Sequence, residues 1–178
     1  MAHDSNIAEA AIYVGTYAKY NDGSLFGKWL KLSDYSDITE FYEACALLHK
    51  DEQDPEYMFQ DYEHIPEELV SECSLSEKFF MVRDALEDLG DSETTPFLIW
   101  CNNTGRKLSS EDTDDLIADF KDDYIGEYDS EKDFAYELAQ QRNDLSEFAK
   151  SYFDYEAYAN DLFGDSYWSE DGYVFYNS

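Results

Sequence analysis

Apolar and aromatic residues alternate with polar ones near the start of the chain, in the stretch AAIYVGTYAKYNDGSLFGKWLKL (residues 10–32). This period of two predicts one strand that continues through Tyr17 and Tyr20, and a second strand that contains Trp29 and Leu30. The sequence Asn21–Gly23 between them is typical of a hairpin turn, because Asp-Gly accepts positive φ. We therefore expect an N-terminal hairpin, with no element formed by residues 1–9.

The next two segments complete a small domain. In residues 36–50, Phe41 and Cys45 recur at helical spacing, and Ser36 or Asp37 is placed to cap that helix. Residues 57–61 alternate as a short strand does. Together with the hairpin, this strand predicts a small mixed sheet with one helix.

From Ile65 onward the hydrophobic period becomes helical. Pro66 is suited to the first turn of a helix, and a second helix should begin at Ser76 and end at Gly90. The apolar run at residues 97–101 is ambiguous between strand and helix. We prefer a helix, because Ser92 can cap it, Pro96 is tolerated in a first turn, and Gly105 can end it.

The segment that follows Leu108 has one apolar and one acidic stripe. A helix that begins at Ser109 or Ser110 would place an apolar stripe on one face and an acidic stripe on the other. The extended segment YIGEY, a helix capped by Ser130 with Asp133 as its capping-box partner, two more helices and a hairpin at Asp171–Gly172 should follow. The apolar stripe is Leu116, Ile117, Phe120 and Tyr124; the acidic stripe is Asp112, Asp115, Asp119, Asp122 and Asp123.

Charge separates this chain from an ordinary globular domain. Its 178 residues include 42 acidic and 12 basic side chains, for a net charge of -30. A small soluble domain needs a net charge of only about 2 to 8. Such a surface repels nucleic acid and anionic membranes and attracts basic proteins. With 43% hydrophobic and 17% aromatic residues, however, the chain should fold around a core.

The net charge nearly matches that of a DNA duplex of the protein's own length, since a compact globule of this size has a diameter of about 40 Å. Duplex DNA carries one charge per ~1.7 Å, so 30 charges correspond to about 50 Å or 15 base pairs. Carboxylates at positions i and i+4 of a helix are separated by a rise of about 6 Å. Acidic helix faces can therefore present a DNA-like pattern of charge. A salt-adapted surface is the competing explanation, and the aromatic content argues mildly against it.

The sequence contains little that would support catalysis or metal binding. His3, His49 and His64 lack metal-ligand spacing, and neither a P-loop nor a GxSxG motif occurs. Paired carboxylates are abundant, but none is singled out as catalytic. The segment DSEKDF resembles the start of a calcium loop, yet Phe134 stands where that loop needs glycine. We expect no enzyme activity, cofactor or metal, and we expect Cys45, Cys73 and Cys101 to be buried, reduced thiols.

Several longer strings resemble the ArdA antirestriction proteins of mobile genetic elements. They are YVGTYAKYNDGSLFGKWLKL, FYEAC with PEYMFQDYEHIPEEL, YIGEYDSEKDFA and FAKSYFDYEAYANDLF, and the resemblance extends over about residues 11–176. It implies an elongated α+β protein of three small domains, 1–65, 66–108 and 109–178, which forms dimers. It also implies an antirestriction motif within Asp133–Ala149.

The resemblance implies a partner as well. Members of the family are DNA mimics that occupy the DNA-binding groove of type I restriction–modification enzymes, in the methyltransferase core. We therefore expect this partner, with no direct nucleic-acid or membrane binding and a cytoplasmic location, since neither a signal peptide nor a long apolar span is visible. The alternative is an acidic protein that sequesters another basic DNA-binding protein.

The candidate site residues follow from the charge pattern and from the resemblance. The acids expected to contact the partner are Asp84, Glu87, Asp88, Asp112, Asp114, Asp115, Asp119, Asp122, Asp123, Glu127, Asp129 and Glu131. The apolar residues expected at a dimer interface are Phe134, Leu138, Leu145, Phe148 and Tyr152.

Overall fold

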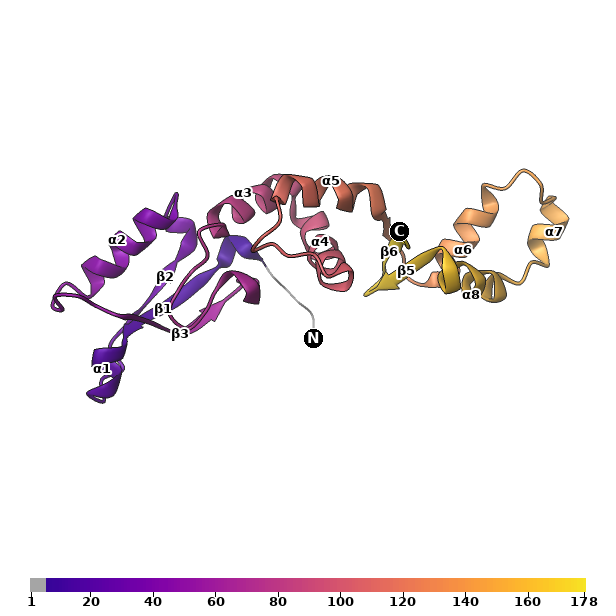
Figure 1. The fold of residues 1–178 in the computed structure, drawn as a ribbon. Helices are drawn as coiled ribbons and strands as arrows, with labels where there is room; N and C mark the ends of the chain where they lie inside the picture. Colours follow the sequence, from indigo (N-terminus) through magenta and orange to yellow (C-terminus); the bar gives the residue numbers. More distant parts are fainter. Residues whose placement is uncertain (1–5) are drawn as a thin grey trace. The chain divides into compact units, whose positions relative to one another are not determined.

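The computed structural model describes residues 6–178 and has a mixed α+β fold, as the sequence predicts (Figure 1). It divides into two compact units, which are the described residues up to Leu116 and residues Ile117–Ser178. Each unit contains one three-stranded sheet. The division into three domains remains a prediction. None of the helices within residues 6–178 has the length and apolar character needed to cross a membrane.

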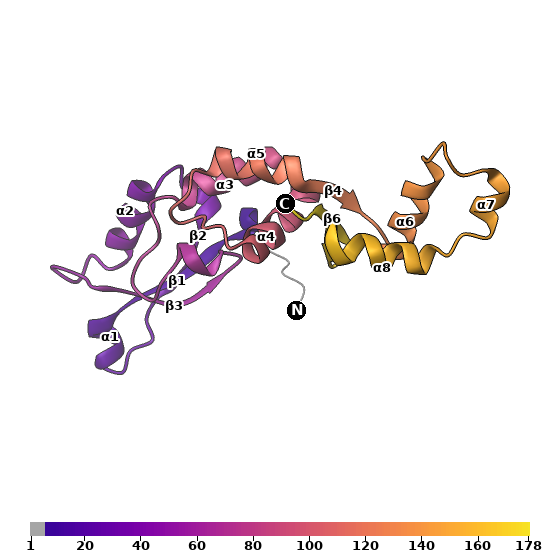
Figure 2. The same cartoon turned by 45° about the vertical axis from the view of Figure 1, so that its right-hand side comes forward.

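The first unit is built on a sheet of strand order β2-β1-β3, formed by β1 (Ala11–Thr16), β2 (Lys28–Lys31) and β3 (Tyr57–Glu63). Both strand pairs are antiparallel, so the expectation of a mixed sheet was wrong. Helix α2 (Ile38–Leu48) lies along one face of this sheet (Figure 2). The side chains buried between them, which form the core here, are Ile12, Val14, Leu30, Phe41, Cys45 and Phe59.

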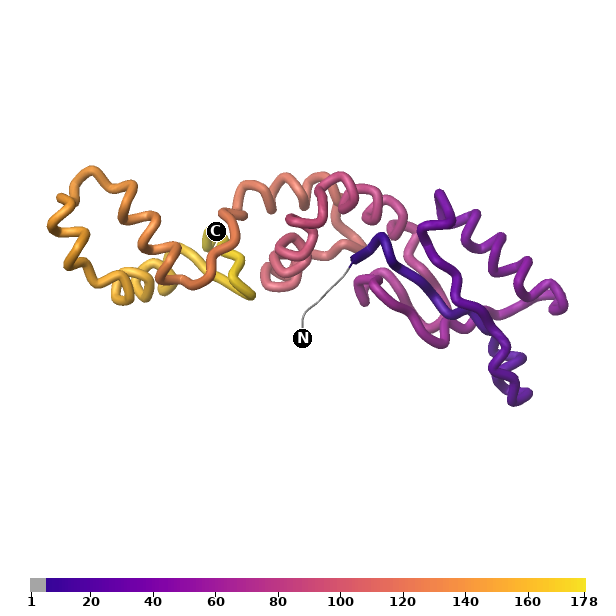
Figure 3. Tube along the Cα trace, turned by 180° about the vertical axis from the view of Figure 1, so that it is seen from behind, coloured from indigo at the N-terminus to yellow at the C-terminus, as the bar shows by residue number. Residues whose placement is uncertain are grey.

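The connection from β1 to β2 differs from the predicted tight hairpin. The first strand ends at Thr16, and Tyr17–Asn21 forms the short helix α1, which continues from the end of β1 (Figure 3). The Thr16 hydroxyl accepts a hydrogen bond from the backbone N–H of Lys19, and this N-cap stabilises a helical turn where the alternation predicted strand. Gly23 has a φ of 80°, as the turn chemistry requires.

The segment before β1 also contains an element that was not expected. Ile7–Glu9 forms the 3₁₀ turn η1, and the Ile7 side chain is buried. Ile7 is the one large apolar residue of this turn, and one such residue provides no periodicity that predicts a helical turn. Residues 1–5, which belong to the same expectation, lie outside the described residues.

The helices after β3 end at the predicted glycines but begin at other residues than predicted. Gly90, at a φ of 92°, ends α3 (Phe79–Leu89), and Gly105, at 72°, ends α4 (Asp91–Thr104). The run at residues 97–101 is therefore helical, as preferred. The starts differ from those expected, and in the described part of the chain no side chain caps any of the three elements at its start. Pro66 precedes only the 3₁₀ turn η3 (Glu67–Leu69), Ser76 accepts a hydrogen bond from the N–H of Lys78 before α3 begins, and Ser92 lies inside α4.

A buried arginine joins α3 to the 3₁₀ turn that follows β2. Arg83 donates hydrogen bonds from Nη1 to the carbonyls of Leu32 and Tyr35, at 3.0 and 2.8 Å, and both carbonyls belong to the 3₁₀ turn η2 (Leu32–Asp34) or its C-cap. Its guanidinium also lies 4.9 Å from the ring centre of Phe80. Arg83 therefore joins α3 to the turn that follows β2, within the first unit.

Helix α5 (Thr113–Asp123) precedes the second sheet, whose strand order is β4-β6-β5. Its strands are β4 (Tyr124–Glu127), β5 (Tyr167–Glu170) and β6 (Tyr173–Tyr176), all antiparallel. The β5–β6 hairpin turns at Asp171 and Gly172, which have φ angles of 53° and 87°, as predicted. Helices α6 (Glu131–Gln140) and α8 (Tyr155–Asp165) pack together, and the short helix α7 (Glu147–Ser151) lies on the excursion between them (Figure 1).

Aromatic rings make the core of this second unit. Phe175 is fully buried and stacks on Trp168, with ring centres 4.1 Å apart. Phe120 stacks on Tyr124 at 5.0 Å. Ser130 caps α6, as predicted: its hydroxyl accepts a hydrogen bond from the Asp133 N–H and donates one to the Asp133 carboxylate. Asp154 caps α8. Gly164 lies inside α8, one residue before its end.

Candidate acidic binding surface

Helix α5 begins three to four residues later than expected, because Asp112 caps it. The Asp112 carboxylate accepts hydrogen bonds from the backbone N–H groups of Asp114 and Asp115, at 3.0 and 3.2 Å. A carboxylate at this position also interacts favourably with the positive end of the helix dipole. Asp112 therefore serves the helix itself, although the charge pattern placed it among the partner-facing acids.

The faces of α5 are divided as the sequence predicts. Leu116 and Phe120 are buried, at 1% and 0% exposure. The exposed side carries a row of carboxylates, which we call the α5 ladder: Asp114, Asp115, Asp119 and Asp122. Asp123 is half-buried and accepts a hydrogen bond from the Ser178 hydroxyl, and Tyr124 has already entered β4.

The acids of α3 are of two kinds. Asp84 forms an ion pair with Arg83, with Nη2 and Oδ1 2.7 Å apart, so part of its charge is neutralised within the unit. Glu87 and Asp88 are exposed one turn further on. Of the three acids of α3, Asp84 is the one that the structure pairs with a cation.

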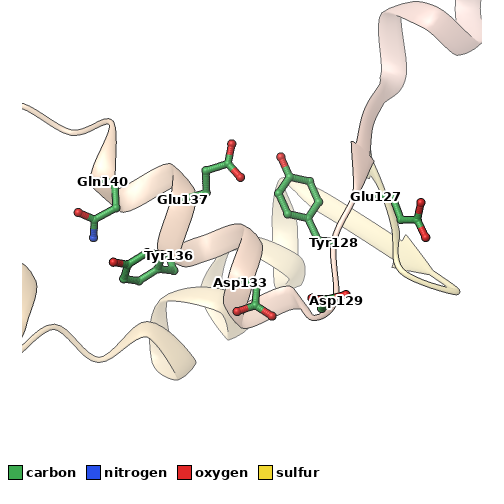
Figure 4. A pocket seen from close by; sticks show the side chains of 7 residues that line it. All are labelled: Glu127, Tyr128, Asp129, Asp133, Tyr136, Glu137 and Gln140. Atoms are coloured by element: carbon green, nitrogen blue, oxygen red, sulfur yellow. The ribbon is translucent and has the colours of Figure 1, made fainter.

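The second unit has an acidic hollow between the end of β4 and α6, with a volume of about 510 Å³ (Figure 4). Tyr128 and Glu137 face each other across it, and Asp133, Tyr136 and Gln140 follow one side of α6. The residues that line it are Glu127, Tyr128, Asp129, Asp133, Tyr136, Glu137 and Gln140.

Both phenol rings of the hollow are held by neighbouring rings. Tyr128 packs edge-on against Phe134, and Tyr136 contacts Tyr155, each at 5.0 Å between ring centres. Burial, and then the Glu137 carboxylate, raise the pKa of the Tyr128 hydroxyl above its ordinary value, so the ring stays neutral. Carboxylates beside neutral aromatic faces favour an ammonium or guanidinium group, through charge attraction and cation–π contact.

Sequence reasoning placed Glu127 and Asp129 on this surface but missed the contribution of α6. Asp133, Tyr136, Glu137 and Gln140 are spaced by three, one and three residues, which is the signal of one helix face. Glu131, which was a candidate, accepts a hydrogen bond from the Ser169 hydroxyl at 2.7 Å and links α6 to β5. Glu131 therefore lies outside the lining of the hollow.

Apolar surface is exposed in the same unit. Phe148 and Tyr152 are 76% and 78% exposed, and their rings lie 5.0 Å apart. Leu138 and Leu145 are half-buried. Phe134 belongs instead to the core, at 4% exposure, so it has little surface to offer a second chain. Among the dimer candidates, the exposed residues are Phe148 and Tyr152.

The three thiols are free but differ in environment. Cys45 and Cys101 are buried as expected, and burial raises the pKa of each thiol to about 12. Cys73 is exposed in a turn, which corrects the expectation that all three are buried. Within residues 6–178, no cluster of three or more His, Cys, Asp or Glu side chains is arranged to hold a metal ion.

Because thiolates are the reactive form, native protein should react with N-ethylmaleimide at Cys73 and not at the other two cysteines. Mass spectrometry after a short treatment at pH 7 should show one adduct, and denatured protein should show three. Rapid labelling of Cys101 or Cys45 in the native state would contradict this assignment, whereas the Cys73→Ser variant should remain unmodified.

Residues 12–175 match the family model described as "Antirestriction protein (ArdA)", and this match covers nearly the whole chain. No curated protein matches the sequence. The matched range includes α5, the hollow and the exposed aromatic pair, all of which are described above. The chain therefore belongs to the ArdA family of antirestriction proteins.

Proposed function

We propose that this antirestriction protein is a DNA mimic that occupies the DNA-binding groove of a type I restriction–modification enzyme. Inhibition then needs no catalysis, because the bound protein excludes DNA from the methyltransferase core, so modification should be blocked together with restriction. One observation carries the proposal. The chain places exposed carboxylates on α5 where, in the described part of the molecule, Asp114, Asp115 and Asp122 have no cationic partner.

This arrangement is unfavourable for the free protein. Like charges three or four residues apart on a helix each cost a few tenths of a kcal/mol. The buried stripe of Leu116 and Phe120 offsets that cost, at roughly 1.5–3 kcal/mol for each large apolar side chain. Binding to a groove lined by Lys and Arg would relieve the repulsion. The same groove binds DNA phosphates, so the acidic surface of this protein and DNA cannot occupy it at the same time.

Competition would test this proposal. A type I enzyme is incubated with fluorescent duplex DNA that contains its recognition site, and the antirestriction protein is added at increasing concentration. We expect stoichiometric displacement of the DNA, which weakens as salt rises. A basic nucleoid protein on the same DNA serves as the control partner. Displacement of the nucleoid protein alone would favour the alternative function, and displacement of neither would refute both.

We also propose that the protein forms a homodimer through Phe148 and Tyr152. An exposed aromatic pair on a highly charged chain is typical of an interface. Two chains of net charge -30 repel each other, so the dimer should strengthen as added salt screens them.

Sedimentation at low and high salt would measure this dimer. We expect the double variant Phe148→Ser/Tyr152→Ser to remain monomeric at both salt concentrations, and Leu47→Ser, which alters an equally exposed residue of the first unit, to behave as the unmodified protein. Dimers that persist in the double variant would place the interface elsewhere.

A further inference from the structure

We propose that Glu68 is a positioning residue, which holds the start of the acidic helix α5 and thereby sets where its first carboxylates lie. This inference rests on the proposed function, because it assigns a role within the same surface. Glu68 is one of 42 acidic residues of the chain, and nothing in the local sequence distinguishes it from the others. Its hydrogen bonds in the folded protein distinguish it.

Glu68 lies in η3 and reaches the turn that precedes α5. Its Oε1 accepts a hydrogen bond from the backbone N–H of Leu108 at 3.1 Å. Its Oε2 accepts from the Ser109 hydroxyl at 3.1 Å and from the Ser109 N–H at 3.4 Å. One carboxylate therefore satisfies three donors of a segment 40 residues away. Bonds of this kind, in which a charged acceptor meets backbone N–H groups, are stronger than neutral ones.

A second carboxylate fixes the other end of that turn. Glu111 accepts hydrogen bonds from the Lys107 N–H at 2.6 Å and from Arg106 Nη1 at 2.9 Å. The Lys107 N–H, and then Arg106, hold the pKa of Glu111 below its ordinary value. Lys78 donates from Nζ to the Glu111 carbonyl, which anchors the turn to α3. Between the two carboxylates, Leu108 is buried at 2% exposure.

The hydrogen bonds of Glu68 and Glu111 to the turn before α5 determine where the exposed acids of the helix lie. Asp112 caps α5 immediately after Glu111, and the first members of the ladder, Asp114 and Asp115, donate the two N–H groups of that cap. Without Glu68, the Leu108 and Ser109 donors would turn to water and the residues before the cap would sample other conformations. The α5 ladder would keep its charge, but its first carboxylates would no longer be held in one position. Glu68 therefore acts through Asp114 and Asp115 rather than by touching the partner.

The neighbouring residue provides a matched control. Glu67 lies in the same 3₁₀ turn, is exposed, and has no hydrogen bond or ion pair in the described part of the chain. Glu67→Ala and Glu68→Ala remove the same charge. We expect Glu67→Ala to weaken DNA displacement by less than about twofold, as one exposed charge does. We expect Glu68→Ala to weaken it about fivefold or more, on the scale of a lost charge-assisted hydrogen bond.

A double-mutant cycle separates positioning from a general loss of stability. Asp114→Asn/Asp115→Asn is introduced into both the unmodified protein and Glu68→Ala, and displacement is measured where circular dichroism shows every variant folded. If Glu68 acts through those two carboxylates, its removal should cost little once they are neutral. A merely structural role would leave the two effects additive, and that result would overturn the inference.

Each remaining outcome also decides the matter. If Glu68→Ala fails to fold, Glu68→Gln replaces it in the same cycle; the amide keeps one acceptor oxygen, so a smaller loss with the same non-additivity is expected. Equal effects at Glu67 and Glu68 would overturn the inference and leave the DNA-mimic function intact. If Asp114→Asn/Asp115→Asn has no effect on displacement, the DNA-mimic assignment of α5 fails, and the role of Glu68 fails with it.

Discussion

Neutralising the whole α5 ladder should remove most of the inhibition. The variant Asp114→Asn/Asp115→Asn/Asp119→Asn/Asp122→Asn keeps the buried stripe and the Asp112 cap, so the helix should form as before. We expect its affinity for a type I enzyme at low salt to fall about 30- to 100-fold, since four exposed charges each contribute modestly to one surface. Asp119→Asn alone should weaken binding by less than about threefold.

A control variant tests whether position or total charge is decisive. Asp22→Asn, Glu43→Gln, Asp54→Asn and Glu67→Gln together remove the same four charges from exposed positions elsewhere in the first unit. Displacement of DNA, measured over a range of salt, should change little for this control. Equal losses for both variants would mean that only the overall field matters, and a single substitution that abolished binding in folded protein would indicate one localised site.

Replacing Phe175 by Ala should strongly destabilise the second unit. Phe175 is fully buried in the central strand, stacks on Trp168 and contacts Tyr124. Removing a buried phenylalanine costs about 3–5 kcal/mol, because both the transfer free energy and the ring contacts are lost. A unit this small has little stability in reserve. Chemical unfolding should therefore show an early transition in Trp168 fluorescence, after Trp29 and Trp100 are replaced by Phe in both the reference and the variant.

Phe148→Ala is the control for this experiment. The same side chain is truncated in the same unit, but 76% of its surface is already exposed. Its free energy of unfolding, measured on monomer at low salt, should change by less than about 0.5 kcal/mol. Equal destabilisation by the two substitutions would show that burial of Phe175 contributes no special stability to the core of the second unit.

The sequence predicts best those features that one short segment determines. Gly90 and Gly105 end their helices because no other residue accepts positive φ so readily, and Ser130 with Asp133 caps α6 through neighbours three residues apart. The α5 stripes follow from helical periodicity in the same way. Errors arose where a second local signal competed, as when the Thr16 cap converted an alternating stretch into α1.

The sequence could not show which carboxylates the protein uses internally. Asp51 and Glu52 pair with Lys19 across 32 and 33 residues, and Glu68 reaches Leu108 across 40. Such partners are brought together only by the complete fold, so no spacing marks them in advance. Local contacts also occupy two acids that the charge pattern assigned to the partner surface: Asp84 pairs with its neighbour Arg83, and Asp112 caps α5.

The two sheets differ in when they can be completed during synthesis. In the first sheet the central strand, β1, leaves the ribosome before either neighbour, so β2 and β3 can each add to it as they emerge. In the second sheet the central strand is β6, the last of the three to be made. At about 5–20 residues per second, β4 waits roughly 2–9 s for Tyr173 to be added. A nascent chain therefore carries the charges of α5 before β4 can pair with β6, and this pairing supports the acidic hollow. A chain whose synthesis stops between β4 and β6 lacks the completed second sheet.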